Sequence, residues 1–203
     1  MISTVIFDIG NVLVDFRPRE FILDKGVSEE KADRILKASV FGGSWGKLDR
    51  GVESERSVIE EFVRNEPALE NEIRTFFANT KGIVKQRPEA KPMIKGLKDA
   101  GFSVLALSNY PRNAYEDDPQ SLDFLELMDG YILSYRDKVV KPEEPIYYTL
   151  IGRYNLVPSE CLYVDDLEEN LVTARRLGIN TILYKDYDSL IKEFASYNVT
   201  FTC

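Results

Sequence analysis

The most informative absence in this sequence is histidine, which occurs nowhere among its 203 residues. Without an imidazole, the chain cannot build a Ser-His-Asp or Cys-His nucleophile system from its own residues. Zinc sites that depend on histidine ligands are excluded for the same reason. Any chemistry must rest on carboxylates, lysines, hydroxyls and amides, together with a hard cation bound through oxygen.

Cysteine and positive charge are also scarce. Cys161 and Cys203 are the only cysteines, and they form neither a disulfide framework nor a zinc-binding spacing. A net charge of −8 argues against nucleic acid or an anionic membrane surface as the main partner. No stretch reaches the length of a transmembrane span, and residues 1–3 lead into a strand without the features of a signal peptide. We therefore expect a cytoplasmic protein that binds neither nucleic acid nor membrane.

The hydrophobic residues, 44% of the chain, are arranged as alternating strand and helix patterns. Short β-rich segments occupy residues 4–7, 102–107, 131–134, 161–164 and 181–184. Their alternation with helical segments predicts an α/β fold with a doubly wound parallel sheet and right-handed crossovers.

Residues 15–85 differ, because they show helical spacing and no strand pattern. A glycine-rich break is expected at residues 41–46 within this stretch. We interpret residues 15–85 as a small helical cap inserted after the first strand. The catalytic core then comprises residues 1–14 and 86–203.

Polar side chains follow the ends of three predicted strands. Asp8 follows the first strand, Ser108 and Asn109 the second, and Asp165 and Asp166 the fourth. One such aspartate is ordinary in a turn. Because the carboxyl ends of parallel strands share one edge of a sheet, where ligands bind in open α/β folds, the set predicts a site there.

The chemistry of this set is mutually consistent. Neighbouring carboxylates repel each other unless a cation neutralises them, and oxygen ligands suit Mg²⁺. Lys141, in the loop after the third strand, would offset further charge and hold a phosphate oxygen. An aspartate can attack phosphorus and form an aspartyl phosphate. These residues therefore indicate phosphoryl transfer without histidine.

The motifs resemble those of the haloacid dehalogenase (HAD) superfamily of hydrolases. Residues 8–13 (DIGNVL) resemble its first motif, Ser108-Asn109 the second, Lys141-Pro142 the third, and residues 164–166 (VDD) with Asn170 the fourth. Each motif alone is weak, but their order and spacing match over essentially the whole chain. The Asp-x-Gly-Asn-Val form is similar to bacterial glucose-1-phosphate phosphatases, and the amino-terminal phosphatase domain of epoxide hydrolases is similar too.

This resemblance implies a role for each matching residue. Asp8 would be the nucleophile and a Mg²⁺ ligand, and Gly10 would offer its backbone carbonyl to the metal. Ser108 and Asn109 would bind the transferring phosphoryl group, and Lys141 would stabilise Asp8 and the phosphate charge. For the fourth motif, it implies that Asp166 is the second carboxylate ligand, that Asp165 is a ligand or holds a water, and that Asn170 lies behind them.

The sequence departs from the superfamily at Gly10. Most phosphatases of this superfamily carry there a second aspartate, which serves as general acid and base. Such catalysis is typically worth about 10²–10⁴-fold in rate. An anomeric phosphate has a better leaving group than a simple alkyl phosphate. Either activity is low, another group takes the role of the acid, or the leaving group needs little protonation. On the last alternative we expect a phosphorylated metabolite, specifically a sugar phosphate, as the substrate.

Contacts to the rest of the substrate are less specified by sequence. Trp45 could stack on a sugar ring or form part of the cap core, and Tyr110 and Arg112 follow the second motif closely enough to face the pocket.

Two alternatives to a Mg²⁺-dependent phosphatase remain open. One is a metal-independent dehalogenase, which would not need the Asp165-Asp166 pair; the other is a non-catalytic protein that binds a phosphorylated metabolite.

Overall fold

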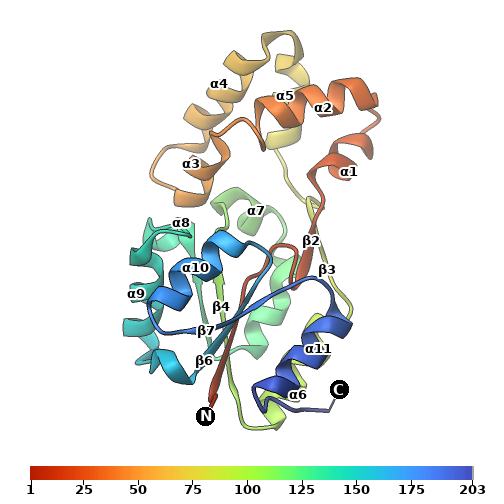
Figure 1. Ribbon diagram of the computed structural model, residues 1–203. Helices are drawn as coiled ribbons and strands as arrows, with labels where there is room; N and C mark the ends of the chain where they lie inside the picture. The colour runs from red at the N-terminus through yellow and green to blue at the C-terminus, as the bar shows by residue number, and fades with distance from the viewer. Residues whose placement is uncertain (203) are drawn as a thin grey trace.

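The centre of the molecule is a five-stranded parallel sheet (Figure 1). The computed structural model describes residues 1–202. In spatial order the strands are β5 (Gly130–Leu133), β4 (Ser103–Ser108), β1 (Thr4–Phe7), β6 (Cys161–Asp165) and β7 (Asn180–Leu183). The predicted α/β fold is confirmed. Because all neighbouring pairs are parallel, every strand ends at the same edge of the sheet.

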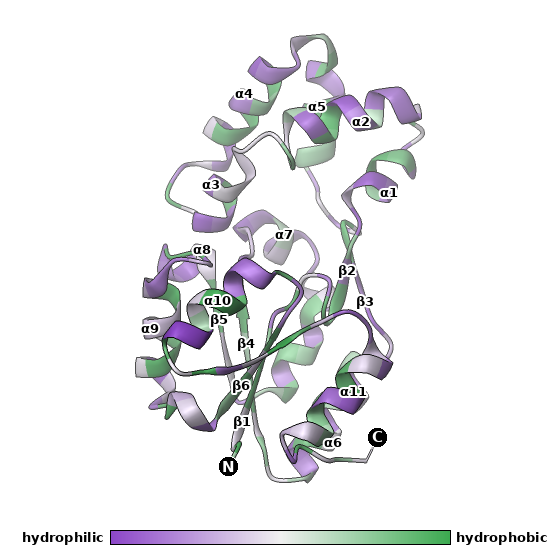
Figure 2. Ribbon diagram, viewed as in Figure 1, coloured by the Kyte–Doolittle hydropathy of each residue, from purple (hydrophilic) through white to green (hydrophobic). Residues whose placement is uncertain are grey.

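Apolar layers cover both faces of the sheet, since successive residues of a strand point to opposite sides. Val5 and Phe7 pack toward α6 (Ala90–Asp99) and α11 (Tyr187–Ser196). Ile6 packs in a second cluster with α9 (Glu144–Tyr154) and α10 (Glu168–Arg176). Figure 2 shows the central strands as mainly hydrophobic. The central strand β1 is thereby buried, and its last residue leads directly into Asp8.

A group of helices lies beyond the carboxyl edge of the sheet (Figure 1). It comprises α1 (Pro18–Leu23), α2 (Glu29–Ala38), α3 (Trp45–Arg50), α4 (Glu55–Asn65), η1 (Pro67–Leu69) and α5 (Glu70–Phe77). Ile35, Phe62 and Ile73 are fully buried among these helices. We propose that they form a cap domain, with residues 1–14 and 86–203 as the core.

The sequence suggested that the stretch between the first two core strands is purely helical. The structure shows that this stretch also contains two short strands. Strands β2 (Val14–Phe16) and β3 (Val84–Gln86) pair antiparallel and join the cap helices to the core. Each has only three residues, too few for an alternating pattern to be recognised. Helix α3 also begins inside the segment predicted to be a glycine-rich break. Both corrections matter, because these elements contribute walls to the cavity described below.

The core contains short helical elements around the strand ends. They are α7 (Arg112–Asp117), η2 (Pro119–Leu127), α8 (Ser134–Asp137) and η3 (Pro158–Glu160). Of these, η2 and η3 are 3₁₀-helices. Helix α8 begins at Ser134, which the sequence had placed in a strand.

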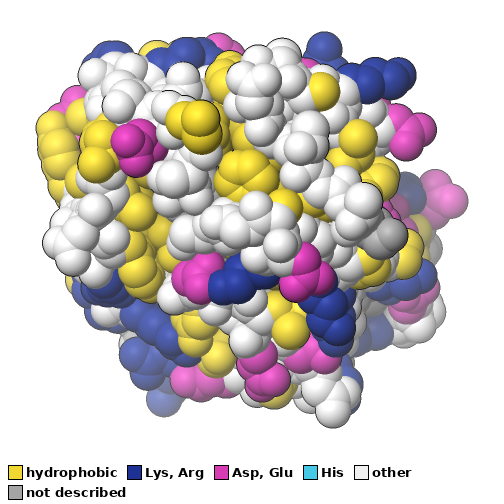
Figure 3. All heavy atoms as spheres, turned by 90° about the horizontal axis from the view of Figure 1, so that it is seen from below, with side chains coloured by type: hydrophobic (Ala, Val, Ile, Leu, Met, Phe, Trp, Pro, Cys, Tyr) yellow, Lys and Arg dark blue, Asp and Glu magenta, His cyan; other side chains and the backbone are white. Residues whose placement is uncertain are grey.

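The surface opposite the cap carries lysine and arginine side chains interspersed with aspartate and glutamate (Figure 3). No helix within residues 1–202 combines the length and apolar character needed to cross a bilayer. Cys161 is a buried free thiol, whereas Cys203 lies outside the described residues.

Candidate active site

A cavity of about 240 Å³ lies where the strand ends of the core meet the cap. Its polar side is formed by core residues after β1, β4 and β6, and its other side by residues of β2, β3 and α3. The lining comprises Asp8, Gly10, Asn11, Phe16, Trp45, Asp49, Ile83, Val84, Asn109, Tyr110, Pro111, Ala114, Lys141, Asp166, Leu167 and Asn170. The structure thus brings together segments that are far apart in the sequence.

Asp8 directly follows β1 and is only 6% exposed. Its backbone N–H donates to the carbonyl oxygen of Val164 at 2.8 Å, which fixes the residue against β6. Its Oδ1 accepts the N–H of Ile9 at 2.6 Å and lies 2.9 Å from Lys141 Nζ. Burial raises the pKa of Asp8 to about 7, although the charge on Lys141 opposes the rise. Both contacts involve Oδ1, so Oδ2 is the oxygen available to react.

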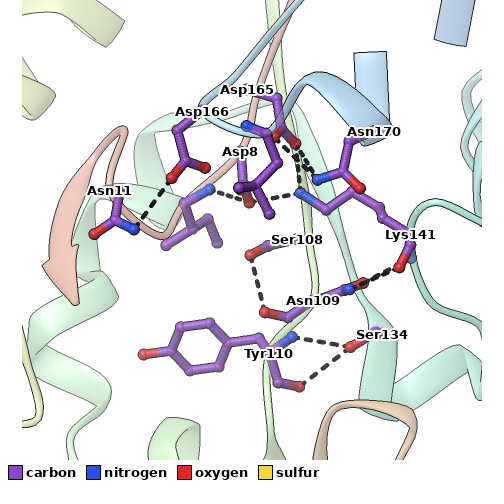
Figure 4. Close-up of polar contacts among 12 residues, drawn as sticks. Asp8, Asn11, Ser108, Asn109, Tyr110, Ser134, Lys141, Asp165, Asp166 and Asn170 are labelled. Atoms are coloured by element: carbon purple, nitrogen blue, oxygen red, sulfur yellow. Dashed lines mark hydrogen bonds and ion pairs between the residues drawn. The ribbon is translucent and has the colours of Figure 1, made fainter. Parts of the chain in front are cut away.

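Lys141 is buried between two carboxylates (Figure 4). Its Nζ lies 2.9 Å from Asp8 Oδ1 and 2.7 Å from Asp165 Oδ2. Burial disfavours the charged amine, but the two carboxylates together raise its pKa. Asn109 clamps the Lys141 main chain, accepting its N–H at 2.8 Å and donating to its carbonyl oxygen at 3.0 Å. The Asn109 amide is therefore engaged in positioning Lys141.

Asp165 is completely buried, and hydrogen bonds occupy both of its oxygens. Oδ1 accepts from the Leu167 N–H at 2.8 Å and from Asn170 at 3.0 Å. Oδ2 accepts from Lys141 and from the Tyr163 hydroxyl. Burial alone would raise its pKa, but Lys141 and these hydrogen bonds hold the pKa of Asp165 below its usual value. Asp165 therefore resembles a structural anchor for Lys141 more than a free metal ligand.

The carboxylate of Asp166 is more available to a cation than that of Asp165. Its Oδ2 accepts a single side-chain hydrogen bond, from Asn11 Nδ2 at 3.1 Å, and burial raises its pKa. Oxygens of Asp8, Asp165 and Asp166 lie within 4.8 Å of one another. Clustered carboxylates repel each other, which contributes to the raised pKa values of Asp8 and Asp166, and a hard divalent cation would relieve that repulsion. The donor set therefore fits Mg²⁺, with Asp8, Asp166 and the Gly10 carbonyl as the candidate ligands.

Of the other residues singled out by sequence, three lie at or near the cavity and one lies outside it. Ser108 is buried, and its Oγ lies 3.4 Å from the Asn109 carbonyl oxygen, which leaves it weakly engaged near Asp8 (Figure 4). Tyr110 and Trp45 line the cavity, and Trp45 also packs on Phe16 with ring centroids 5.8 Å apart. Arg112 is exposed and absent from the lining; its guanidinium lies 5.9 Å from the Tyr135 ring.

Sequence reasoning missed two cavity residues, Asn11 and Asp49. Asn11 adopts a left-handed backbone conformation, with φ 54°, and donates to Asp166. Its position after Gly10, in a residue type that tolerates positive φ, was the available indication. Asp49 lies on α3, is 9% exposed, and has an Oδ1 atom without a hydrogen-bond partner. Nothing in its local sequence distinguishes it from a surface acid.

Several known proteins are similar in sequence to most of this chain. It is 25% identical over 213 residues to the putative phosphatase YhcW of Bacillus subtilis, covering 96% of this chain and 93% of that protein. It is 24% identical to the sesquiterpene phosphatase astK of Aspergillus oryzae, with 87% of each chain covered. Mouse acyl-CoA dehydrogenase family member 10 is 27% identical over 93% of this chain, which spans only 18% of that protein's length.

Solved structures share the fold. A HAD family enzyme of Bacteroides thetaiotaomicron in complex with magnesium and inorganic phosphate superposes with a TM-score of 0.70 at 18% identity, covering 94% of this chain and 99% of that one. An L-2-haloacid dehalogenase of Xanthobacter autotrophicus reaches 0.64 at 16% identity, covering 98% and 85%. The sequence model of the haloacid dehalogenase-like hydrolases matches residues 2–178. With that match, the strand order and the carboxylate cluster at the strand ends, the chain belongs to the haloacid dehalogenase-like hydrolases.

Proposed function

We propose that this protein is a Mg²⁺-dependent phosphatase of a small phosphorylated metabolite. The observation that carries the proposal is the arrangement around Asp8. One oxygen of this buried carboxylate is held by Lys141, the other is available to react, and a second carboxylate, Asp166, is free to share a cation. A nucleophile beside a metal-binding acid is the arrangement that phosphoryl transfer through a covalent intermediate needs.

In the proposed reaction, Asp8 Oδ2 attacks phosphorus in line with the leaving oxygen. The new Oδ2–phosphorus bond forms as the ester bond breaks, and the substrate alcohol departs. Water then attacks the phosphorus of the aspartyl phosphate, which releases inorganic phosphate and restores the Asp8 carboxylate. Throughout, Lys141 holds Oδ1 and offsets the negative charge. Bound Mg²⁺ would supply further charge neutralisation for the phosphoryl oxygens.

A sugar phosphate is our first candidate for the substrate. Its anomeric leaving group would need less protonation, in keeping with Gly10 in place of an acid, and Trp45 contributes an aromatic side chain to the cavity lining. A second candidate is a phosphate ester with an apolar alcohol, because the wall formed by Phe16, Ile83 and Val84 is hydrophobic. The likeness to a sesquiterpene phosphatase agrees with this second possibility.

A screen of phosphorylated metabolites with Mg²⁺ tests the proposal and separates the two substrates. We expect metal-dependent phosphate release, with the highest kcat/KM for either an anomeric sugar phosphate or an apolar alkyl phosphate. Removing the cation with a chelator should abolish release, and Mg²⁺ should restore it.

A parallel assay of halide release from 2-haloacids tests the dehalogenase alternative. A dehalogenase would release halide from 2-haloacids without a divalent cation, and it would not need Asp166 next to a buried Asp165. Halide release in the absence of Mg²⁺, with no phosphate release from any ester, would reverse the assignment. Binding of phosphorylated metabolites without turnover would instead favour the non-catalytic alternative.

A further inference from the structure

The first-motif loop of this protein contains no carboxylate that could transfer a proton to or from the substrate. The position two residues after Asp8 is Gly10, whose backbone lines the cavity. A Cβ atom built there meets nothing within 4 Å, so the loop leaves open space where a longer side chain could extend. If the protein is the phosphatase proposed above, on which this inference rests, an alkyl alcohol, which leaves poorly as an anion, must take its proton from another group.

The cap provides a carboxyl group at the same cavity. Asp49 on α3 lines it together with Asp8 and Lys141. It is only 9% exposed, and its Oδ1 has no hydrogen-bond partner in the structure. A buried polar atom without a partner calls for an explanation, and a catalytic role is one. Burial raises the pKa of Asp49 to about 7, although the charge on Lys141 and a hydrogen bond from the Trp45 side chain oppose the rise.

The position of Asp49 is fixed by contacts between α3 and the core. The Ser134 hydroxyl donates to the Asp49 carbonyl oxygen at 2.6 Å and accepts the Tyr110 N–H at 2.9 Å. The cap residue is thereby linked to the residue that follows Ser108-Asn109.

The next two residues strengthen this connection. Arg50 forms an ion pair with Glu143, and Lys138 donates to the Gly51 carbonyl oxygen. We call these contacts, together with the Ser134 hydrogen bond, the α3–α8 latch. The latch holds the Asp49 side chain at the cavity without using its carboxylate oxygens.

We propose that Asp49 is the general acid and base of the reaction, taking the role for which the first-motif loop has no residue. The protonated Asp49 carboxyl donates its proton to the ester oxygen as the bond from that oxygen to phosphorus breaks, so the substrate leaves as a neutral alcohol. The resulting carboxylate accepts a proton from the water that attacks the aspartyl phosphate. This returns Asp49 to its protonated form, and no further reactant is needed.

A pair of substrates with different leaving groups tests this role. Asp49→Asn, the wild type and a control variant, Glu53→Gln, would be assayed with an alkyl phosphate and with nitrophenyl phosphate. Glu53 is an exposed acid four residues away that pairs with Lys47 and lies outside the cavity lining. We expect kcat for the alkyl phosphate to fall by about 10²–10⁴-fold in Asp49→Asn, and the fall for the aryl phosphate, whose anion leaves without a proton, to be at least tenfold smaller. Glu53→Gln should match the wild type.

A second variant separates proton transfer from a structural effect. In the double variant Gly10→Asp, Asp49→Asn, a carboxylate returns to the cavity from the first-motif loop, and we expect partial recovery of alkyl phosphate turnover. Equal losses on both substrates, without recovery in the double variant, would overturn the role of Asp49. A wild type that hydrolyses neither ester with Mg²⁺ would instead overturn the proposed phosphatase function, so the two failures are distinguishable.

Discussion

Asp165 and Asp166 are neighbours in the sequence, yet their side chains meet different surroundings. Asp165 is completely buried, and its oxygens accept hydrogen bonds from Lys141, Tyr163, Asn170 and a backbone N–H. Asp166 accepts one side-chain hydrogen bond, from Asn11. The first carboxylate therefore fixes the buried lysine, whereas the second is available to a cation.

This difference predicts that two adjacent substitutions affect stability differently. Asp165→Asn should lower the free energy of unfolding by about 3 kcal/mol, because it removes one partner of a buried ion pair. Asp166→Asn should change it by less than about 1 kcal/mol in the absence of metal but remove the stabilisation by added Mg²⁺. Urea denaturation with and without Mg²⁺ measures both. Equal losses of stability in the two variants would contradict the division of roles.

Asp49 should make stability depend on pH. Its pKa is raised to about 7 in the folded protein, whereas an unfolded aspartate ionises near pH 4. Between these values the unfolded state binds fewer protons, so the contribution of Asp49 to stability falls as pH rises from about 4 to 7. Without Mg²⁺, Asp49→Asn should therefore stabilise the protein relative to wild type at pH 8, by up to about 4 kcal/mol, and have little effect at pH 4. A difference between the two proteins that does not change with pH would contradict the burial of an ionisable Asp49.

At the scale of elements, the end of α3 determines how the cap meets the core. Gly51 ends this helix with φ 62°, and a Cβ atom there would lie 3.0 Å from both the Cβ and the carbonyl oxygen of Tyr135. Only glycine allows both the left-handed backbone and this close approach. Gly26 offers a comparison, because its φ is 80° but a Cβ there meets nothing within 4 Å.

Alanine at these two glycines should separate backbone strain from cap docking. Gly26→Ala should cost about 1 kcal/mol of stability and leave kcat unchanged, since only the backbone conformation is penalised. Gly51→Ala should also shift α3 away from α8 and lower kcat by roughly 10–100-fold. Hydrogen exchange of the α3 amides, measured beside kcat, reports the shift. Wild-type kcat in Gly51→Ala would show that the α3–α8 latch is unimportant for the reaction.

At the scale of the whole molecule, the cavity combines two surfaces of different origin. The core contributes the polar groups of Asp8, Lys141 and Asp166, and the cap with its connecting strands contributes mainly apolar side chains and Asp49. In the proposed reaction the core thus supplies the nucleophile and the metal-binding groups, whereas the cap supplies the apolar wall and the proton-transfer residue.

The core portion of this arrangement could be predicted from sequence. Asp8, Ser108 and Asp165 each lie at the carboxyl end of a buried strand, and parallel strands bring their ends to one edge whatever the details of packing. The placement of Asp49 could not be predicted, because it depends on how α3 docks on α8, through contacts between residues about 85 positions apart. The β2–β3 pair was missed for a related reason, since its pairing joins residues 14–16 to 84–86.

The central claim, that Asp8 is the nucleophile of a Mg²⁺-dependent phosphatase, is tested most directly by Asp8→Asn. Phosphate release from nitrophenyl phosphate would be measured for the wild type, Asp8→Asn and a remote control, Asp188→Asn, each with Mg²⁺ and with a chelator. We predict Mg²⁺-dependent release by the wild type and the control, and none by Asp8→Asn, with thermal denaturation showing that all three are folded. Wild-type turnover in Asp8→Asn would contradict the claim.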